Sequence, residues 1–182
     1  MGTLINNHLK VGYSDYNLFF VKRYYRELSL SDKILDIGCG HYRNLYLFKN
    51  LGFYNFYGID KLLPEPSLSI KSDSTFFVDF VHQDINEGLN YNEKYFDIVL
   101  CNFVLMFMEH KHLKNTINDI LRVTKGFCII ETQKQFHKSK KSSMVDYDFK
   151  EIVKIIEANN EFEILDKKIY KEKLIIRRKS NG

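Results

Sequence analysis

The sequence predicts an α/β fold built on a seven-stranded, mostly parallel sheet, with helices on both faces and an antiparallel hairpin at the C-terminus. Three observations predict it. Short apolar runs alternate with segments of helical spacing along most of the 182 residues. The first apolar run ends in glycines, at 38 and 40, which is typical of a strand that turns tightly into a helix. The last two apolar runs are separated only by a polar stretch, 170–173, which predicts the hairpin. Alternating strands and helices make a parallel sheet with right-handed crossovers, so we expect a Rossmann-like arrangement.

Each element follows from its own pattern. The segment that we expect to be a loop contains both prolines, Pro64 and Pro66. The pair Lys125 and Gly126 is expected to break the chain between a helix and the strand after it. In chain order we expect a helix at 14–30, a strand and turn at 33–40, a helix at 41–51, a strand at 55–61, a loop at 62–75, strands at 76–84 and 95–102, a helix at 109–123, a strand at 126–132, a helix at 145–160 and the hairpin strands around 170–173.

Composition narrows the class of protein. The chain is 45% hydrophobic and 27% charged, so it can bury a core, and its length fits one domain, 1–182. No apolar run is long enough to span a bilayer, and no N-terminal segment resembles a signal peptide. The three cysteines, Cys39, Cys101 and Cys128, form no CxxC pair, and the last two lie in apolar runs. We therefore expect a cytoplasmic protein that has no membrane partner and binds no structural zinc.

Charge is distributed unevenly along the chain. From Lys134 to the end there are 13 Lys and Arg against 8 Asp and Glu, a balance of +5, whereas the first 133 residues carry 14 against 15, a balance of −1. A basic C-terminal third would favour an anionic substrate. A solvated basic surface is the simpler interpretation of the same charges.

The strongest local motif is the glycine turn, which runs Asp36-Ile37-Gly38-Cys39-Gly40. Gly38 lets the chain turn sharply, and Gly40 lets the backbone approach a ligand without a Cβ in the way. The helix that follows presents free backbone N–H groups. Glycines in such a turn also have a purely structural use, so the motif needs support from other residues.

Polar residues at the ends of the next strands give that support. Asp60 lies at the end of the second strand, 20 residues after Gly40, where a carboxylate can accept hydrogen bonds from both ribose hydroxyls of a nucleoside. Asp84 follows the third strand, where its carboxylate can accept from an adenine amino group while the Ile85 N–H donates to a ring nitrogen. Asn102 ends the fourth strand, where the reactive end of the ligand is expected. Parallel sheets bind ligands beyond these strand ends.

A dinucleotide-binding domain would share the glycine turn and Asp60. It would place a third glycine at position 43, where this chain has Arg43. The sequence therefore favours a nucleoside ligand other than NAD.

The segments "ILDIGCG", "YGID", "HQDI" and "FDIVLCN", in this order, resemble the motifs of class I S-adenosylmethionine (SAM)-dependent methyltransferases. The resemblance covers roughly residues 33–132. Within it, "GCGHYRNLYLF" and the segment from Val104 to Ile130 are similar to small methyltransferases of the tellurite-resistance type. The chain departs from that type at Tyr42, in the loop 62–75 and in its last third.

The resemblance implies a role for each motif. It implies that residues 33–132 bind SAM, that 1–30 form a helical lid or packing segment, and that 133–182 form the substrate side and the terminal hairpin. Lys61 would flank the adenosine, and the backbone of Asn102, with Phe103, would lie near the methionine end and the transferable methyl. The cofactor-binding set is Asp36, Gly38, Cys39, Gly40, Asp60, Lys61, Asp84, Ile85, Asn102 and Phe103, with S-adenosylhomocysteine (SAH) as the product.

No residue stands out as the catalytic base or as a metal ligand. His41 and His137 are candidates for contact with the acceptor, although solvated positions are the simpler interpretation for both. Tyrosines near the N-terminus (Tyr13, Tyr16, Tyr24 and Tyr25) could form a lid, but packing of a helix on the sheet is favoured. The preferred function is methyl transfer to a small molecule. A nucleic-acid methyltransferase and a non-catalytic SAM-binding protein are the alternatives.

Overall fold

The computed structural model of the chain describes residues 12–63, 75–133 and 148–180. Its centre is a seven-stranded sheet in the order β3-β2-β1-β4-β5-β7-β6, in which β7 runs in the direction opposite to the other six strands. The order reverses between β1 and β4, which is where a ligand crevice is expected. The strands are β1 (Lys33–Ile37), β2 (Asn55–Asp60), β3 (Asp79–His82), β4 (Phe96–Asn102), β5 (Thr124–Glu131), β6 (Phe162–Lys168) and β7 (Lys173–Arg178).

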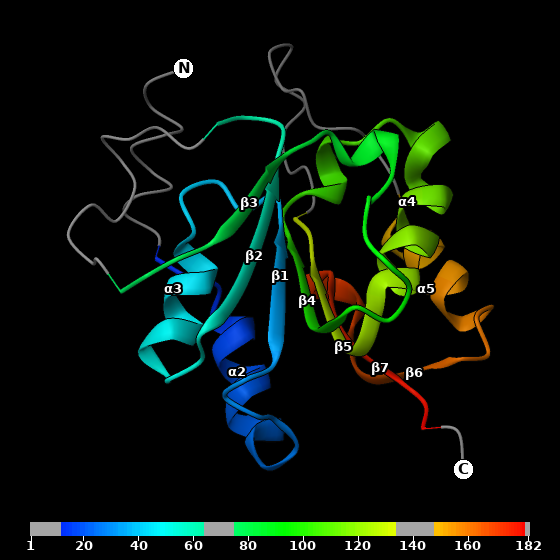
Figure 1. Cartoon of the computed structure of the whole chain (residues 1–182). Coiled ribbons are helices and arrows are strands. Elements are labelled where there is room, and N and C mark those ends of the chain that lie inside the picture. Colours follow the sequence, from blue (N-terminus) through cyan, green and yellow to red (C-terminus); the bar gives the residue numbers. More distant parts are fainter. Residues whose placement is uncertain (1–11, 64–74, 134–147, 181–182) are drawn as a thin grey trace.

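Helices cover both faces of the sheet (Figure 1). On one face lie α2 (Asp15–Tyr24) and α3 (Arg43–Asn50), which bury Phe20 and Phe48 against one side of the strands. On the other face lie α4 (His110–Val123) and α5 (Phe149–Glu157), which bury Ile117 and Ile152 against the other side. Short 3₁₀ turns η1 (Tyr25–Glu27), η2 (Ile85–Glu87), η3 (Leu105–Phe107) and η4 (Ile169–Lys171) complete the described elements. The expected fold class is therefore confirmed.

Side-chain caps explain where two helices begin. Ser14 precedes α2, and its hydroxyl accepts a hydrogen bond from the backbone N–H of Tyr16. Asp148 caps α5 in the same way by accepting from the N–H of Lys150. The helix expected at 145–160 thus begins only at Phe149, and residues 145–147 lie outside the described part of the chain.

Two expectations about element bounds were wrong. The strand expected at 76–84 is only four residues long, Asp79–His82. The pair Lys125 and Gly126 does not break the chain, because α4 passes directly into β5 at Thr124 and both residues lie inside the strand. Gly126 instead allows β5 to lie close to β4, since a Cβ there would lie 2.6 Å from the backbone oxygen of Asp97. The register between β4 and β5 shifts at Asp97. Most of the loop expected at 62–75 lies outside the described residues.

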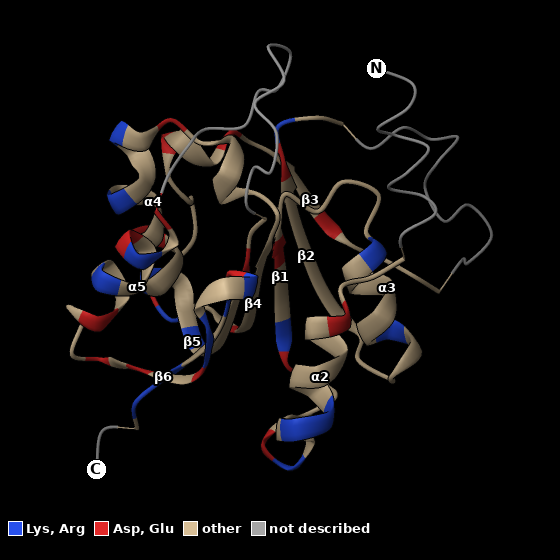
Figure 2. Ribbon diagram, turned by 180° about the vertical axis from the view of Figure 1, so that it is seen from behind, with Lys and Arg blue, Asp and Glu red and all other residues tan. Residues whose placement is uncertain are grey.

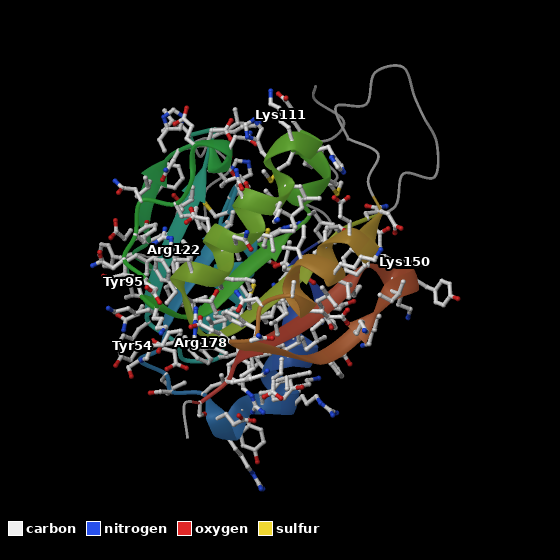
Figure 3. The ribbon with its side chains drawn as sticks, turned by 90° about the vertical axis from the view of Figure 1, so that its right-hand side faces the viewer. Tyr54, Tyr95, Lys111, Arg122, Lys150 and Arg178 are labelled. Atoms are coloured by element: carbon white, nitrogen blue, oxygen red, sulfur yellow. The ribbon has the colours of Figure 1, made fainter. Side chains whose placement is uncertain are left out.

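The terminal hairpin is confirmed. Hydrogen bonds connect it to the C-terminal end of α4. The Arg178 side chain donates to the carbonyl oxygens of Leu121 and Thr124, at 2.7 and 2.8 Å. Arg122 donates to the carbonyl oxygens of Leu89 and Tyr91, and both arginines are labelled on this side of the molecule in Figure 3. All three cysteines are buried and unbonded. In the part of the chain that is described, no helix is long and apolar enough to cross a membrane.

Candidate ligand site at the strand tips

The glycine turn after β1 is tied to the neighbouring strand. The backbone N–H groups of Gly38 and Cys39 both donate to the carbonyl oxygen of Ile59, at 2.7 and 3.1 Å. Gly38 and Gly40 have positive φ values, 67° and 49°, which L-residues with a side chain rarely adopt. The turn is therefore fixed in place by the last residues of β2.

Asp60 at the end of β2 completes this connection. Its Oδ2 accepts from the N–H of Gly40, and its Oδ1 accepts from the N–H of Leu62, both at 2.9 Å. A carboxylate has about four acceptor positions, so each oxygen can accept one more hydrogen bond. The side chain is thus preorganised and still able to accept from a ligand.

Asp84 lies beyond the end of β3 and caps the turn η2. Its Oδ1 accepts from both the backbone N–H and the side-chain amide of Asn86, at 2.9 and 2.8 Å. The adjacent Ile85 is buried. Gln83 donates to the carbonyl of Gly88, while the side-chain oxygens of Gln83 and Asn86 are buried with no partner among the described residues.

Asn102 ends β4, and its side chain is turned away from solvent. Its Oδ1 accepts from the Asn17 amide at 3.0 Å, and its own amide donates to Glu131 at 3.3 Å. The next residue, Phe103, has a positive φ of 61°, and its N–H donates to the carbonyl of Glu131 at 2.6 Å. The tip of β4 therefore offers mainly backbone to a neighbouring ligand.

These strand tips surround one cavity of about 650 Å³. Gly38, Asp60 and Asp84 all line it. Nine of the ten residues expected to bind the cofactor belong to its lining: Gly38, Cys39, Gly40, Asp60, Lys61, Asp84, Ile85, Asn102 and Phe103. A cavity of this size is typical of a small-molecule site.

Asp36, the tenth residue, lies behind the lining in β1. It is 1% exposed, and no hydrogen bond of ordinary geometry reaches either carboxylate oxygen from a described residue. Burial raises the pKa of Asp36 to about 7, and the nearby Arg43 guanidinium and Asn44 amide only partly oppose this. A buried carboxylate whose charge is only partly balanced is costly, so Asp36 fits a cationic ligand group nearby.

The cavity also contains residues that the strand-end pattern did not predict. Arg43 and Asn44 enter it from the first turn of α3, and Phe107 and Met108 enter it from the segment before α4. Their position after the glycine turn could have indicated the first pair. The position of Phe107 and Met108 in the cavity depends on how the chain folds after β4, and no motif in the sequence indicates that.

Tyr42 does not line the cavity. Its ring makes edge contacts with Phe76 and Phe80, with centroids 6.2 Å apart in both cases. The expectation that Tyr42 crowds or covers the ligand therefore finds no support in the lining.

The N-terminal tyrosines differ in what they contact. Tyr16 is buried, and the Tyr24 ring contacts Phe20 and Phe127, so both pack α2 on the sheet. Tyr13 lines the cavity, and Tyr25 is mostly exposed.

The histidines give no metal site among the residues that the structure describes. His41 lines the cavity, and its Nδ1 is buried without a partner in the described chain. His110 contacts Glu151 at 2.8 Å on the surface. His137 lies outside the described residues.

A second, more open hollow of about 800 Å³ lies between η2 and α4. It shares Gln83 and Asn86 with the first cavity, and its other walls carry amide side chains and the Arg122–Asp119 pair. It contains neither the glycine turn nor Asp60, so the strand-tip cavity is the candidate site.

Comparison with known proteins identifies a family model described as a methyltransferase domain, which matches residues 35–130. That match spans more than half of the chain and includes the glycine turn, Asp60, Asp84 and Asn102. No curated protein matches the sequence.

Solved structures share the fold. A SAM-dependent methyltransferase from Archaeoglobus fulgidus is 18% identical, with a TM-score of 0.68 over 97% of this chain and 99% of its own. The magnesium protoporphyrin IX methyltransferase ChlM from Synechocystis PCC 6803, solved with bound SAM, is 17% identical, with a TM-score of 0.67 over 91% and 79%. The [4+2]-cyclase SpnF is 20% identical, with a TM-score of 0.65 over 84% of this chain, which spans only 57% of the cyclase. These likenesses confirm the fold and leave the activity to the site.

Proposed function

Because the chain belongs to the methyltransferase domain family, we propose that it binds SAM and transfers its methyl group to a small-molecule acceptor, leaving SAH. The observation that carries this proposal is the single cavity that brings together the glycine turn, Asp60 and Asp84. Asp60 would hold the ribose, with Lys61 flanking the adenosine. Asp84 and Ile85 would frame the adenine.

The methionine end of SAM would lie between the glycine turn and the tip of β4. Gly38, Cys39 and Gly40 would line it through their backbone, and Asn102 and Phe103 would line its other side. The buried carboxylate of Asp36, whose charge Arg43 and Asn44 balance only in part, supports a positively charged amino group close by.

The chemistry requires alignment more than it requires a base. SAM supplies an electrophilic methyl group on its sulfonium. The residues of the cavity have to orient the acceptor and exclude water, and such positioning can lower the activation barrier by roughly 7–11 kcal/mol. A base is needed only if the acceptor must lose a proton. Among the described histidines, His41 lines the cavity, and its Nδ1, which has no partner in the described chain, makes it the candidate for that role.

The acceptor class rests on the walls of the cavity. Arg43 lines it and would favour an acceptor with an anionic group. None of the described residues that line the cavity comes from the basic C-terminal third, of which residues 134–147 lie outside the description. The similarity to the tellurite-resistance type stays a prediction at the level of subfamily.

A nucleic-acid acceptor receives less support. Several basic side chains of the hairpin form ion pairs with carboxylates, including Lys167 with Glu157 and Arg177 with Glu163. Figure 2 shows Lys and Arg interspersed with Asp and Glu along α5 and β6. A continuous basic surface, which backbone binding requires, is not evident on these elements.

Calorimetry with SAM and SAH tests the proposal. The wild type should bind both, and Asp60→Asn should bind both at least tenfold more weakly because it loses the charge that the ribose hydroxyls would face. Asp60→Asn is preferable to Asp60→Ala because it keeps an oxygen for the Gly40 or Leu62 N–H. Asp79→Asn, at an exposed carboxylate at the start of β3, is the matched control and should bind normally. Equal binding by Asp60→Asn would refute the ribose assignment.

Turnover separates an enzyme from a SAM-binding protein without activity. The full chain is incubated with methyl-labelled SAM and a fractionated cell extract, and SAH formation is followed. Label transfer into a low-molecular-weight fraction is expected. Tight SAM binding without SAH in any fraction would instead support the non-catalytic alternative, and transfer into nucleic acid would overturn the acceptor class.

A further inference from the structure

The segment just before α2 crosses the strand tips at the cavity. Gly12 and Tyr13 line the cavity, and Ser14 follows them as the cap of α2. The Ser14 N–H donates to Asn44 Oδ1 at 3.1 Å, and the Ser14 hydroxyl donates to Glu131 Oε2. Asn44 belongs to α3, which follows β1, whereas Glu131 ends β5. Since β4 separates β1 from β5 in the sheet, Ser14 bridges the two sides of the point where the strand order reverses.

Glu131 is the centre of this attachment. It is 3% exposed, and its Oε2 also accepts from the Asn102 amide at 3.3 Å. Its Oε1 pairs with Lys173, the first residue of β7. One buried carboxylate therefore connects α2, the tip of β4 and the hairpin. Buried ion pairs add little net stability compared with apolar packing, but they can fix one arrangement, which favours a positional role for Glu131.

The helix itself is anchored elsewhere. The Tyr16 hydroxyl donates to Asp166 at 2.6 Å, and Lys168 Nζ lies 4.2 Å from the centroid of the Phe19 ring. Phe20 is completely buried against the sheet. Loss of the Ser14–Glu131 bond should therefore release the residues that precede α2 while the helix stays docked.

We propose that Ser14 is a positioning residue for methyl transfer: through its bonds to Glu131 and Asn44 it holds Tyr13 across the part of the cavity that takes the methionine end of SAM. This inference rests on the proposed function. The two anchors of Ser14 lie beside the glycine turn and beside Asn102, which are the two walls assigned to the methionine end. Tyr13, with 41% of its surface exposed, would form the outer wall there and exclude water from the transferable methyl.

Ligand dissociation rates test the proposal on the full chain. Ser14→Ala and Tyr13→Ala should release SAH about tenfold faster than the wild type. Both should release 5′-methylthioadenosine at the normal rate, because that probe lacks the amino-acid part of the ligand. Ser14→Thr keeps the hydroxyl and should restore the wild-type rate.

The Ser14 hydroxyl also caps α2, so a matched cap deletion is needed as the control. Asp148→Ala removes the equivalent cap of α5, far along the chain from the cavity lining, and should leave SAH dissociation unchanged. Hydrogen exchange gives a readout independent of ligand: in Ser14→Ala the amides of Ser14 and Tyr16 should exchange faster, because the Ser14 bond to Asn44 loosens and the Tyr16 N–H loses its acceptor. The amides beyond the first turn of α2 should stay protected.

The outcomes separate this inference from the proposed function. If the wild type binds neither SAM nor SAH, the proposed function fails. If it binds them and Ser14→Ala releases SAH at the wild-type rate, the positioning role of Ser14 is refuted. If Ser14→Ala accelerates the release of 5′-methylthioadenosine as much as that of SAH, Tyr13 does not act at the methionine end, and the proposal is also overturned.

Discussion

The side chain of Val104 fills the space that a Cβ on Gly38 would occupy. An ideal Cβ built on Gly38 would overlap Cγ2 of Val104, and the backbone of Gly38 has a φ of 67°. Two separate constraints therefore require glycine at position 38. One is the left-handed backbone conformation of the turn, and the other is the Val104 side chain, which leaves no space for a Cβ.

Gly38→Ala is expected to weaken SAM binding more than tenfold and to lower the free energy of unfolding by about 1–3 kcal/mol, because the turn must shift or Val104 must move. Calorimetry and thermal unfolding measure the two effects. Adding Val104→Ala should relieve the overlap but not the backbone strain, so the double variant should regain only part of the stability lost. Unchanged binding by Gly38→Ala would contradict the close approach of the turn to the ligand.

The buried Asp36 carboxyl should make stability depend on pH. Its pKa is raised from 3.8 to about 7 in the folded protein, first of all by burial. The folded state then holds a proton that the unfolded state has lost between about pH 4 and pH 7, so this group's contribution to the free energy of unfolding falls as pH rises through that range and levels off above it. Asp36→Asn should remove the fall, and its stability relative to wild type should rise with pH by up to a few kcal/mol. Urea unfolding of both proteins at pH 5 and pH 8 measures this difference, and a difference independent of pH would refute a neutral Asp36.

Ligand binding should act on the same carboxyl. A SAM amino group near Asp36 would favour its charged form, so binding near pH 6.5 should release a proton. Calorimetry of SAH binding in buffers with different ionisation enthalpies measures the number of protons released. Asp36→Asn, or wild type at pH 9, should release fewer, and equal values under all conditions would argue against the assigned position of the amino group.

The clustering of the site residues could be predicted because it follows from topology. The C-terminal ends of parallel strands meet at one edge of a sheet, so residues that end or follow β1, β2, β3 and β4 come together whatever lies between them in sequence. Gly38, Asp60, Asp84 and Asn102 are such residues. A local pattern, an apolar run that ends in a glycine, a carboxylate or an amide, was sufficient to find them.

The parts that could not be predicted depend on packing between distant elements. Ser14 and Glu131 are 117 positions apart, and their contact requires α2 to dock on the sheet, which no motif in the sequence encodes. The prediction of a break at Gly126 was wrong for a related reason. Glycine indicates a turn when only neighbours in sequence are considered, whereas here the backbone of Asp97 in the adjacent strand leaves no space for a side chain.

Gly126→Ala should destabilise the protein without affecting the site. A Cβ on Gly126 would lie 2.6 Å from a backbone oxygen, which cannot move as freely as a side chain, so we expect a loss of about 1–3 kcal/mol in the free energy of unfolding. SAM affinity of the folded variant should stay within about twofold of wild type. A fully stable Gly126→Ala protein would show that β4 and β5 can separate at this point.

Tyr42 provides the last test, because the sequence left its effect on the ligand open. Tyr42 has a φ of 63° and comes directly before α3, and its ring packs against Phe76 and Phe80 outside the cavity. Tyr42→Gly relieves the left-handed backbone, worth about 1–2 kcal/mol, and loses the packing of a half-buried ring, worth a similar amount. The free energy of unfolding should therefore change by less than about 2 kcal/mol, and SAM affinity by less than threefold. A large gain in affinity, measured by calorimetry, would mean that the ring reaches into the cavity in solution, and a large loss would mean that it forms part of the ligand site.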